Sequence, residues 1–225
     1  MKRFQMHHTL AAVALIFGLS ATASATSGQW DTALAVGNDA GTGSGASGNS
    51  WISDIGENDI YAEWNVFDLY PTDATPDLGG SGVLTELTGA AFLTSGGNIY
   101  SFAAPTSFTV DTSGLDTGGT VWLRLATQGT PTTGIATLNG VEATLVETYS
   151  ASLGGFGGDE TEGYFMWENV APSASFTFAF QAVESSLSLD QVAIYGMAAA
   201  VPEPASWAMM LAGLGLAGGI ARRRR

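Results

Sequence analysis

The chain of 225 residues has a formal net charge of −14 and contains no cysteine. Between residues 26 and 200 a single base, Arg124, stands against twenty carboxylates, a formal charge of −19, so nucleic acids and anionic lipid surfaces are disfavoured as partners. The same stretch holds no histidine, lysine or cysteine, which excludes serine and cysteine triads, Schiff-base chemistry and histidine-ligated zinc within it.

The first 25 residues have the three parts of a secretory signal peptide. Lys2 and Arg3 precede an apolar stretch at residues 10–19, and small residues follow up to Ala25. The apolar stretch is too short for a lasting membrane span, so we expect export and cleavage after Ala25. Because no disulfide can form, the exported body must rest on an apolar core, which fits a bacterial protein.

Residues 26–200 are expected to form one all-β domain, a jelly-roll-like β-sandwich of nine or ten strands. Short β-prone runs alternate there with clusters of Gly, Asn, Asp, Ser and Thr, and no long amphipathic helix is apparent. The Gly- and Ser-rich residues 37–48 are expected to be a mobile loop. The expected strands are residues 59–67, 99–103, 107–111, 120–127, 135–138, 141–149, 163–168, 175–183 and 187–195.

Two of these predictions are specific. Asn139-Gly140 between two β-prone runs is the dipeptide that best fits a type I′ hairpin turn. In the run 175–183, Phe176, Phe178 and Phe180 alternate with polar residues, so we expect the three phenylalanines to face the core.

Two acidic clusters near glycines, which we expect to lie in loops, suggest calcium, the only cofactor that the sequence suggests. The candidate metal ligands are Asp111 and Asp116 in one cluster and Asp159, Glu160 and Glu162 in the other. Neither cluster has the EF-hand spacing, and solvated loop charge is the alternative interpretation of both. For Asp190 we favour a structural role over a ligand role.

Trp122 and Arg124 are the candidate ligand-binding residues. They are two apart on one expected strand and therefore share a face, where an aromatic ring beside a guanidinium suits a sugar or a carboxylated polysaccharide. The alternative, which we favour, is that Arg124 pairs with one of the many acids.

Catalysis would require two carboxylates about 5 to 10 Å apart in a cleft, as in a glycosidase. Glu57 with Glu63, or Glu142 with Glu147, are the pairs that such a site would use. With this many acids some pairs fall close together by chance, so we expect no enzymatic activity.

Most of the positive charge of the chain lies at its C-terminal end. Residues 205–221 are apolar and, as a helix of roughly 26 Å, are just long enough to cross a bilayer. Arg222, Arg223, Arg224 and Arg225 follow and would stay on the cytoplasmic side by the positive-inside rule. The residues predict a single hydrophobic helix with a retention tail and leave open whether the anchor is permanent or temporary.

Pro202-Glu203-Pro204, followed by the apolar segment and the arginine cluster, resembles the PEP-CTERM sorting signal of Gram-negative bacteria. The resemblance covers residues 201–225 and implies that exosortase, an integral-membrane cysteine protease, acts at the sorting motif after a transient stay in the inner membrane. Residues 61–79 and 187–197 also resemble the opening and closing segments of exported β-sandwich proteins that carry this tail.

We therefore expect an exported protein of the cell surface or the extracellular matrix with a structural or adhesive role. The alternative is a carbohydrate-binding module for the exopolysaccharide of a biofilm, stabilised by calcium. The two differ in one feature, because a binder should expose aromatic side chains together and a structural protein should bury them.

Overall fold

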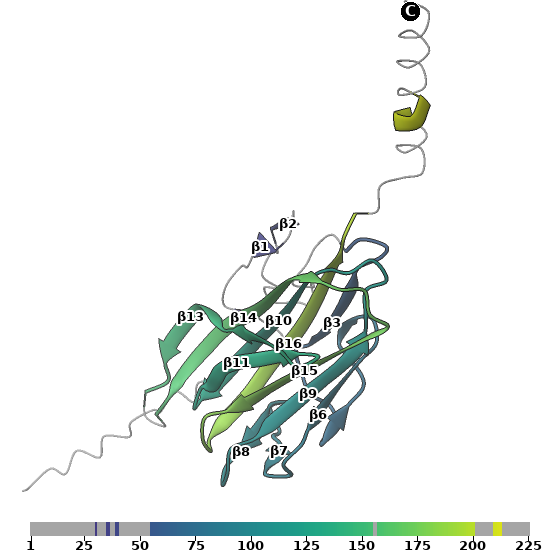
Figure 1. The fold of residues 1–225 in the computed structure, drawn as a ribbon. Coiled ribbons are helices and arrows are strands. Elements are labelled where there is room, and N and C mark those ends of the chain that lie inside the picture. Colours follow the sequence, from purple (N-terminus) through teal and green to yellow (C-terminus); the bar gives the residue numbers. More distant parts are fainter. Residues whose placement is uncertain are drawn as a thin grey trace, which may run out of the picture.

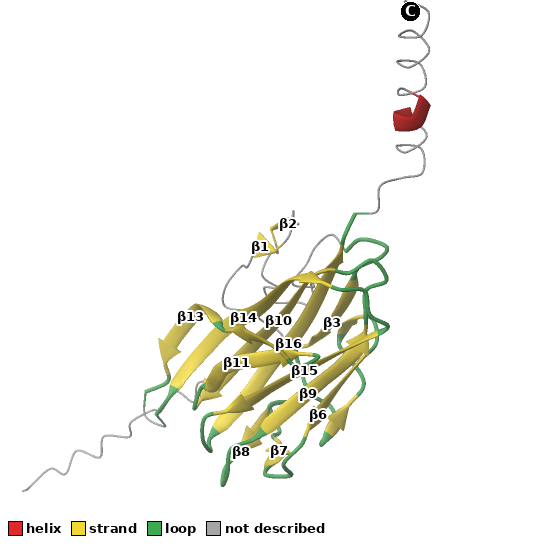
Figure 2. Ribbon diagram, viewed as in Figure 1, coloured by secondary structure: helices red, strands yellow, loops and turns green. Residues whose placement is uncertain are grey.

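The computed structural model describes residues 55–154, 157–200 and 209–212, together with Trp30, residues 35–36 and residues 39–40. Strands make up most of the described chain, and the only described helical residues are 209–212 (Figures 1 and 2). This confirms the all-β fold. The strands are β1 Ala35–Val36, β2 Asp39–Ala40, β3 Ile60–Trp64, β4 Thr72–Asp73, β5 Leu78–Gly79, β6 Gly82–Glu86, β7 Ala91–Leu93, β8 Ile99–Ser101, β9 Ser107–Ser113, β10 Gly119–Gly129, β11 Thr132–Leu138, β12 Val141–Thr144, β13 Val146–Ser152, β14 Asp159–Val170, β15 Ser175–Ala182 and β16 Leu187–Ala198.

Two antiparallel sheets form the body. The eight-stranded sheet has the order β13-β14-β10-β16-β3-β5, and β8 joins it beside β16 with β7 as its outer neighbour. The six-stranded sheet has the order β12-β11-β15-β9-β6-β4. Figure 1 labels its four inner strands, β11, β15, β9 and β6. The short strands β1 and β2 pair with each other. The long final strand β16 lies between β10 and β3, in the interior of the larger sheet.

The main core lies between the two sheets. Phe176, Phe178 and Phe180 of β15 are buried there, which confirms the predicted phenylalanine row. From the eight-stranded sheet, Trp167 meets Phe178 edge-on with their ring centroids 5.6 Å apart. Each buried phenylalanine contributes about 1.5–3 kcal/mol through its removal from water. The body is therefore stabilised by its apolar core and by no disulfide, since the chain contains no cysteine.

The predicted hairpin turn is confirmed, but the strand after it is not continuous. Asn139 and Gly140 both have positive φ angles, 49° and 83°, as a type I′ turn requires, and Leu138 pairs with Val141. The expected strand 141–149 is wrong, because the chain changes sheet at Leu145. Strand β12 pairs with β11 in the six-stranded sheet, whereas β13 pairs with β14 in the eight-stranded sheet. A strand at the edge of a sandwich can leave one sheet for the other at such a corner.

Strands β4 to β7, between residues 72 and 93, were not predicted. They are short, and their turn residues interrupt the alternation of apolar and polar side chains. In β6 the residue facing the core at one end is Gly82, where an added Cβ would lie 2.6 Å from Trp64. The glycine leaves space for the fully buried Trp64 indole. Because it has no apolar side chain, it also breaks the alternation from which the strand could have been predicted.

Other expectations fall partly or wholly outside the described residues. Residues 39–40 pair with residues 35–36, so this part of the expected loop 37–48 is a strand; residues 41–48 are not described. The predicted signal peptide, the Pro-Glu-Pro motif and the arginine tail lie outside the described residues, as does most of the apolar segment 205–221. Within the part of the chain that the structure describes, no helix has the length and apolar character needed to cross a membrane.

Candidate functional site

A row of large side chains covers the face of the eight-stranded sheet that points away from the main core. Register places Glu63 of β3 opposite Ala193 of β16, and Ala193 opposite Arg124 of β10. One row along, Tyr61, Tyr195 and Trp122 follow in the same order. Residues that pair directly across antiparallel strands project from the same face, so these rows form a second cluster, the outer-face cluster. Its buried apolar members are Trp30, Tyr61, Trp122, Ala126, Ala193 and Tyr195.

Arg124 lies at the centre of the outer-face cluster. Its Nη2 donates to Glu162 Oε2 at 2.9 Å, and its guanidinium lies 4.1 Å from the centroid of the Trp30 ring. The Trp30 indole donates to Glu63 at 3.2 Å, and the Tyr61 hydroxyl also donates to Glu63. Burial lowers the pKa of Arg124, and the neighbouring Glu162, Glu63 and Tyr61 oppose that shift. The cluster therefore fastens Trp30, far away in sequence, onto the sheet.

The structure confirms the preferred interpretation of the Trp122 and Arg124 pair. Both are buried, Arg124 with an exposed fraction of 0%, and Arg124 pairs with an acid, Glu162. Trp122 stacks on Tyr195 with ring centroids 5.3 Å apart. These side chains share a face as predicted, but they pack within the protein and form no open platform for a sugar.

An aromatic patch that the sequence interpretation missed lies on the β7–β8 hairpin. Phe92 and Tyr100 are paired across the hairpin with centroids 5.7 Å apart, and Phe102 lies 6.5 Å from Tyr100. Phe92 is 49% exposed and Phe102 is 72% exposed. The sequence could have predicted this patch. Alternation in Ile-Tyr-Ser-Phe, residues 99–102, places Tyr100 and Phe102 on the face opposite the core residue Ile99.

The last strand is held firmly at its C-terminal end. The Ala198 amide donates to Asp59 Oδ1 at 2.8 Å, and the Ala199 amide donates to the Gly118 carbonyl at 2.9 Å. The Thr117 hydroxyl donates to the Ala199 carbonyl at 3.2 Å. Both backbone polar groups of Ala199 are therefore bonded to the body, three residues before Pro202.

The family model described as the PEP-CTERM protein-sorting motif matches residues 200–225. The chain carries a PEP-CTERM sorting signal. The match confirms the resemblance noted for Pro202-Glu203-Pro204 and the residues that follow it. The PEP-CTERM signal begins at residue 200, directly after Ala199, whose amide and carbonyl are both hydrogen-bonded to the body.

The PEP-CTERM signal implies export by way of a transient step at the membrane and processing by exosortase, a membrane protease. It identifies where the chain is sent and leaves the activity of residues 26–200 open. A comparison with curated proteins found no match to this chain.

The five candidate metal ligands do not gather at one place. The expectation that residues 159–162 lie in a loop is wrong, because they begin strand β14, and Glu162 is turned into the ion pair with Arg124. Asp111 lies in β9 and accepts a hydrogen bond from Thr177, while Asp116 lies exposed in the turn after it. Among the described residues, no three acidic side chains form a group that could hold a metal ion. Calcium binding stays a prediction from sequence.

The remaining acidic residues take different positions. Glu63 is buried in the outer-face cluster, whereas Glu57 is exposed. Glu142 and Glu147 are exposed on β12 and β13, which belong to different sheets. Asp190 is buried in β16, where the register with β10 shifts.

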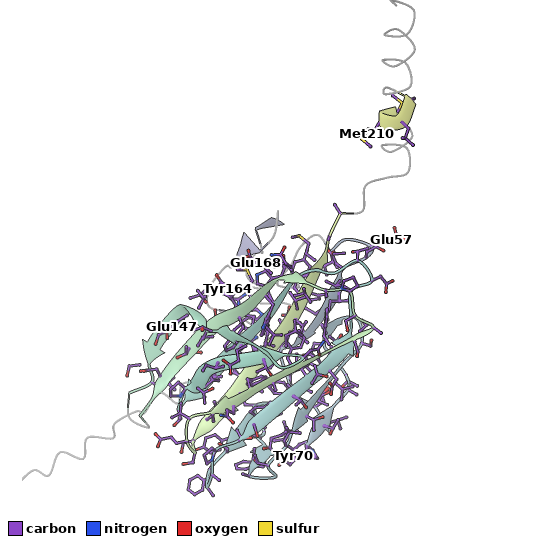
Figure 3. All side chains as sticks on the ribbon, viewed as in Figure 1. Glu57, Tyr70, Glu147, Tyr164, Glu168 and Met210 are labelled. Carbon is purple, nitrogen blue, oxygen red and sulfur yellow. The ribbon has the colours of Figure 1, made fainter. Side chains whose placement is uncertain are left out.

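A further buried carboxylate, Glu86, organises the end of the body that carries Tyr70 (Figure 3). It accepts hydrogen bonds from the Thr106 and Thr88 hydroxyls, from the amides of Thr88 and Gly89 and from the Tyr70 hydroxyl. Burial raises the pKa of Glu86, but the bonds from Thr106, Thr88 and Gly89 outweigh it and bring the pKa below its ordinary value of 4.5.

We expect the Glu86 carboxylate to make stability depend on pH. Because its pKa is lower in the folded chain, its contribution is fully present above about pH 4.5 and is lost as the pH falls through the folded value. The variant Glu86→Gln should lower the free energy of unfolding at pH 7 by about 1–3 kcal/mol, with the difference from the wild type shrinking in acid. Urea unfolding at pH 7 and in acid measures both. The exposed control Glu184→Gln should change stability by less than about 0.5 kcal/mol, and a constant difference for Glu86→Gln at all pH values would contradict the assignment.

Proposed function

We propose that the chain is an exported structural or adhesive protein, delivered through its PEP-CTERM signal to the cell surface or the surrounding exopolymer. The signal peptide, cleaved after Ala25, starts export, and residues 26–200 form the delivered body, a jelly-roll-like sandwich. The observation that carries the structural role is the burial of the tryptophans that the structure describes, Trp30, Trp64, Trp122 and Trp167. A body that uses these rings to support its own packing suits a scaffold.

Deletion of the gene tests this role. We expect the wild-type protein in the surface or exopolymer fraction of its own cells, and we expect the deletion strain to lose surface attachment or matrix cohesion. Complementation with the full chain should restore both. Normal attachment and normal matrix in the deletion strain would contradict a structural or adhesive role.

The second candidate function is binding of a neutral polysaccharide, and the aromatic patch of Phe92, Tyr100 and Phe102 favours it. Exposed rings stack on the apolar faces of sugars, while the acidic body would repel an anionic polymer. Ser188 pairs with Tyr100 across β16 and β8 and is half-buried beside the patch, where its hydroxyl accepts a hydrogen bond from the buried Asn98 amide at 3.3 Å. A hydroxyl at this place supplies a polar contact that complements a sugar.

We expect the aromatic patch to account for any binding seen on a glycan array. Replacement of Tyr100 and Phe102 by alanine should weaken retention on the glycan about tenfold or more, which corresponds to roughly 1.4 kcal/mol. Leu87→Ala is the matched control, because Leu87 is also apolar and exposed but stands outside the patch. Equal loss in both variants, or unchanged binding in the double variant, would contradict the second function.

A further inference from the structure

The folded body ends almost at the sorting motif. Ala199 is bonded to Gly118 and Thr117, and only Ala200 and Val201 separate it from Pro202. Three steps of 3.8 Å between successive Cα atoms bring Pro202 to within about 11 Å of Ala199 even when the chain is fully extended. That distance is smaller than the radius of gyration of a domain of 100 residues, about 13 Å.

A protease that binds Pro202-Glu203-Pro204 therefore has to touch the body. The apolar segment starts at residue 205, so the motif has no free length on its other side either. We propose that the end of the sandwich around the last residues of β16 is a docking surface for exosortase. The docking surface consists of residues 55–59 and 114–119 with Ala198 and Ala199. This inference rests on the processing of the PEP-CTERM signal stated above.

Glycines build one side of the docking surface. A Cβ added to Gly118 would lie 2.3 Å from the Val170 carbonyl oxygen, and one added to Gly119 would lie 2.0 Å from the Met197 carbonyl oxygen. Both glycines have positive φ angles, 67° and 155°. No side chain fits at either position, so this turn packs backbone against backbone around the end of β16. Because this surface is already ordered before a partner binds, binding costs little conformational entropy.

Asp59 builds the other side. Its carboxylate accepts hydrogen bonds from the Gly56 amide at 2.9 Å, the Tyr195 hydroxyl at 3.0 Å and the Ala198 amide at 2.8 Å. It thereby ties the turn at residues 55–59 to β16. Beside it lies a cleft of about 370 Å³ whose lining includes Ile55, Asp59, Ile60 and Tyr61. A cleft of this size accepts a protruding side chain of the partner.

The charge of the docking surface indicates the chemistry of the contacting region. Glu57 and Asp116 are exposed on its two turns, and Figure 3 shows Glu57 at the end of the body where β16 finishes. Complementarity therefore favours a basic rim on exosortase.

Site-specific photo-crosslinking tests the docking surface. The full chain, with p-benzoylphenylalanine in place of Asp116 or, in a second variant, of Glu57, is expressed in cells that hold exosortase with its catalytic cysteine replaced. Glu184 is the control position, because it is an exposed acid like the other two and precedes β16, whose first residue lies about 35 Å from Ala198 along the strand.

We expect both docking-surface positions to cross-link to exosortase at least fivefold more than position 184. Insertion of twelve Gly and Ser residues between Ala200 and Val201 should reduce that excess to below twofold, since the motif can then reach the protease without the body. Cross-linking from positions 116 and 57 no stronger than from position 184, with the unmodified chain processed normally in wild-type cells, would overturn the docking surface alone. Failure of wild-type cells to process the unmodified chain would overturn the sorting role and the docking surface together.

Discussion

Replacement of Glu162 by alanine is expected to lower the free energy of unfolding by about 3–5 kcal/mol, because it leaves the buried charge of Arg124 without its ion-pair partner. Arg124 is the only base between residues 26 and 200, and it lies fully buried beneath the Trp30 ring. The destabilised variant should also release Trp30 from the sheet. Urea unfolding followed by tryptophan fluorescence measures both effects.

Two controls test whether the loss of stability comes from breaking the ion pair rather than from removing any glutamate. Glu142→Ala removes an exposed glutamate of β12 and should change stability by less than about 0.5 kcal/mol. The double variant Arg124→Met with Glu162→Met removes both charges and keeps apolar volume, so it should be more stable than Glu162→Ala. A double variant as unstable as Glu162→Ala would show that the charge of Arg124 is not the cause.

Replacement of Pro202, Glu203 and Pro204 by alanine is expected to abolish processing of the PEP-CTERM signal. The prolines lack amide donors and bias the chain towards the extended form in which proteases bind their substrates. Without them the precursor should accumulate in the membrane fraction with its arginine tail intact, and its processing rate should fall at least tenfold. Pulse-chase labelling followed by fractionation measures this rate.

The matched control is Pro105→Ala, which removes an exposed proline far from the motif in sequence. It should be processed at the wild-type rate. Normal processing of the triple alanine variant would show that the protease reads another part of the chain.

The sequence predicted the parts of the fold that depend on local chemistry. The Asn139-Gly140 turn and the row of Phe176, Phe178 and Phe180 were correct because turn geometry and strand alternation act over a few residues. The change of sheet at Leu145 was missed, since it depends on which partner strand lies nearest on each side of that residue. Residue patterns along one strand carry no such information.

In the candidate site, too, local patterns predicted some features, and features that depend on distant residues were missed. Strand alternation correctly placed Trp122 and Arg124 on one face, but their burial depends on Trp30 and Glu162, which are distant in the sequence. The position of Ala199 at the edge of the sorting motif was equally hidden. It depends on hydrogen bonds to Asp59 and Gly118 from other parts of the fold.

The most direct test of the sorting mechanism is the intact mass of the protein recovered from the cell surface or the culture fluid of its own cells. Processing at the PEP-CTERM signal predicts a polypeptide that ends near Pro204 and lacks the apolar segment and Arg222 to Arg225. A surface-exposed or released protein that still carries the four arginines would contradict it.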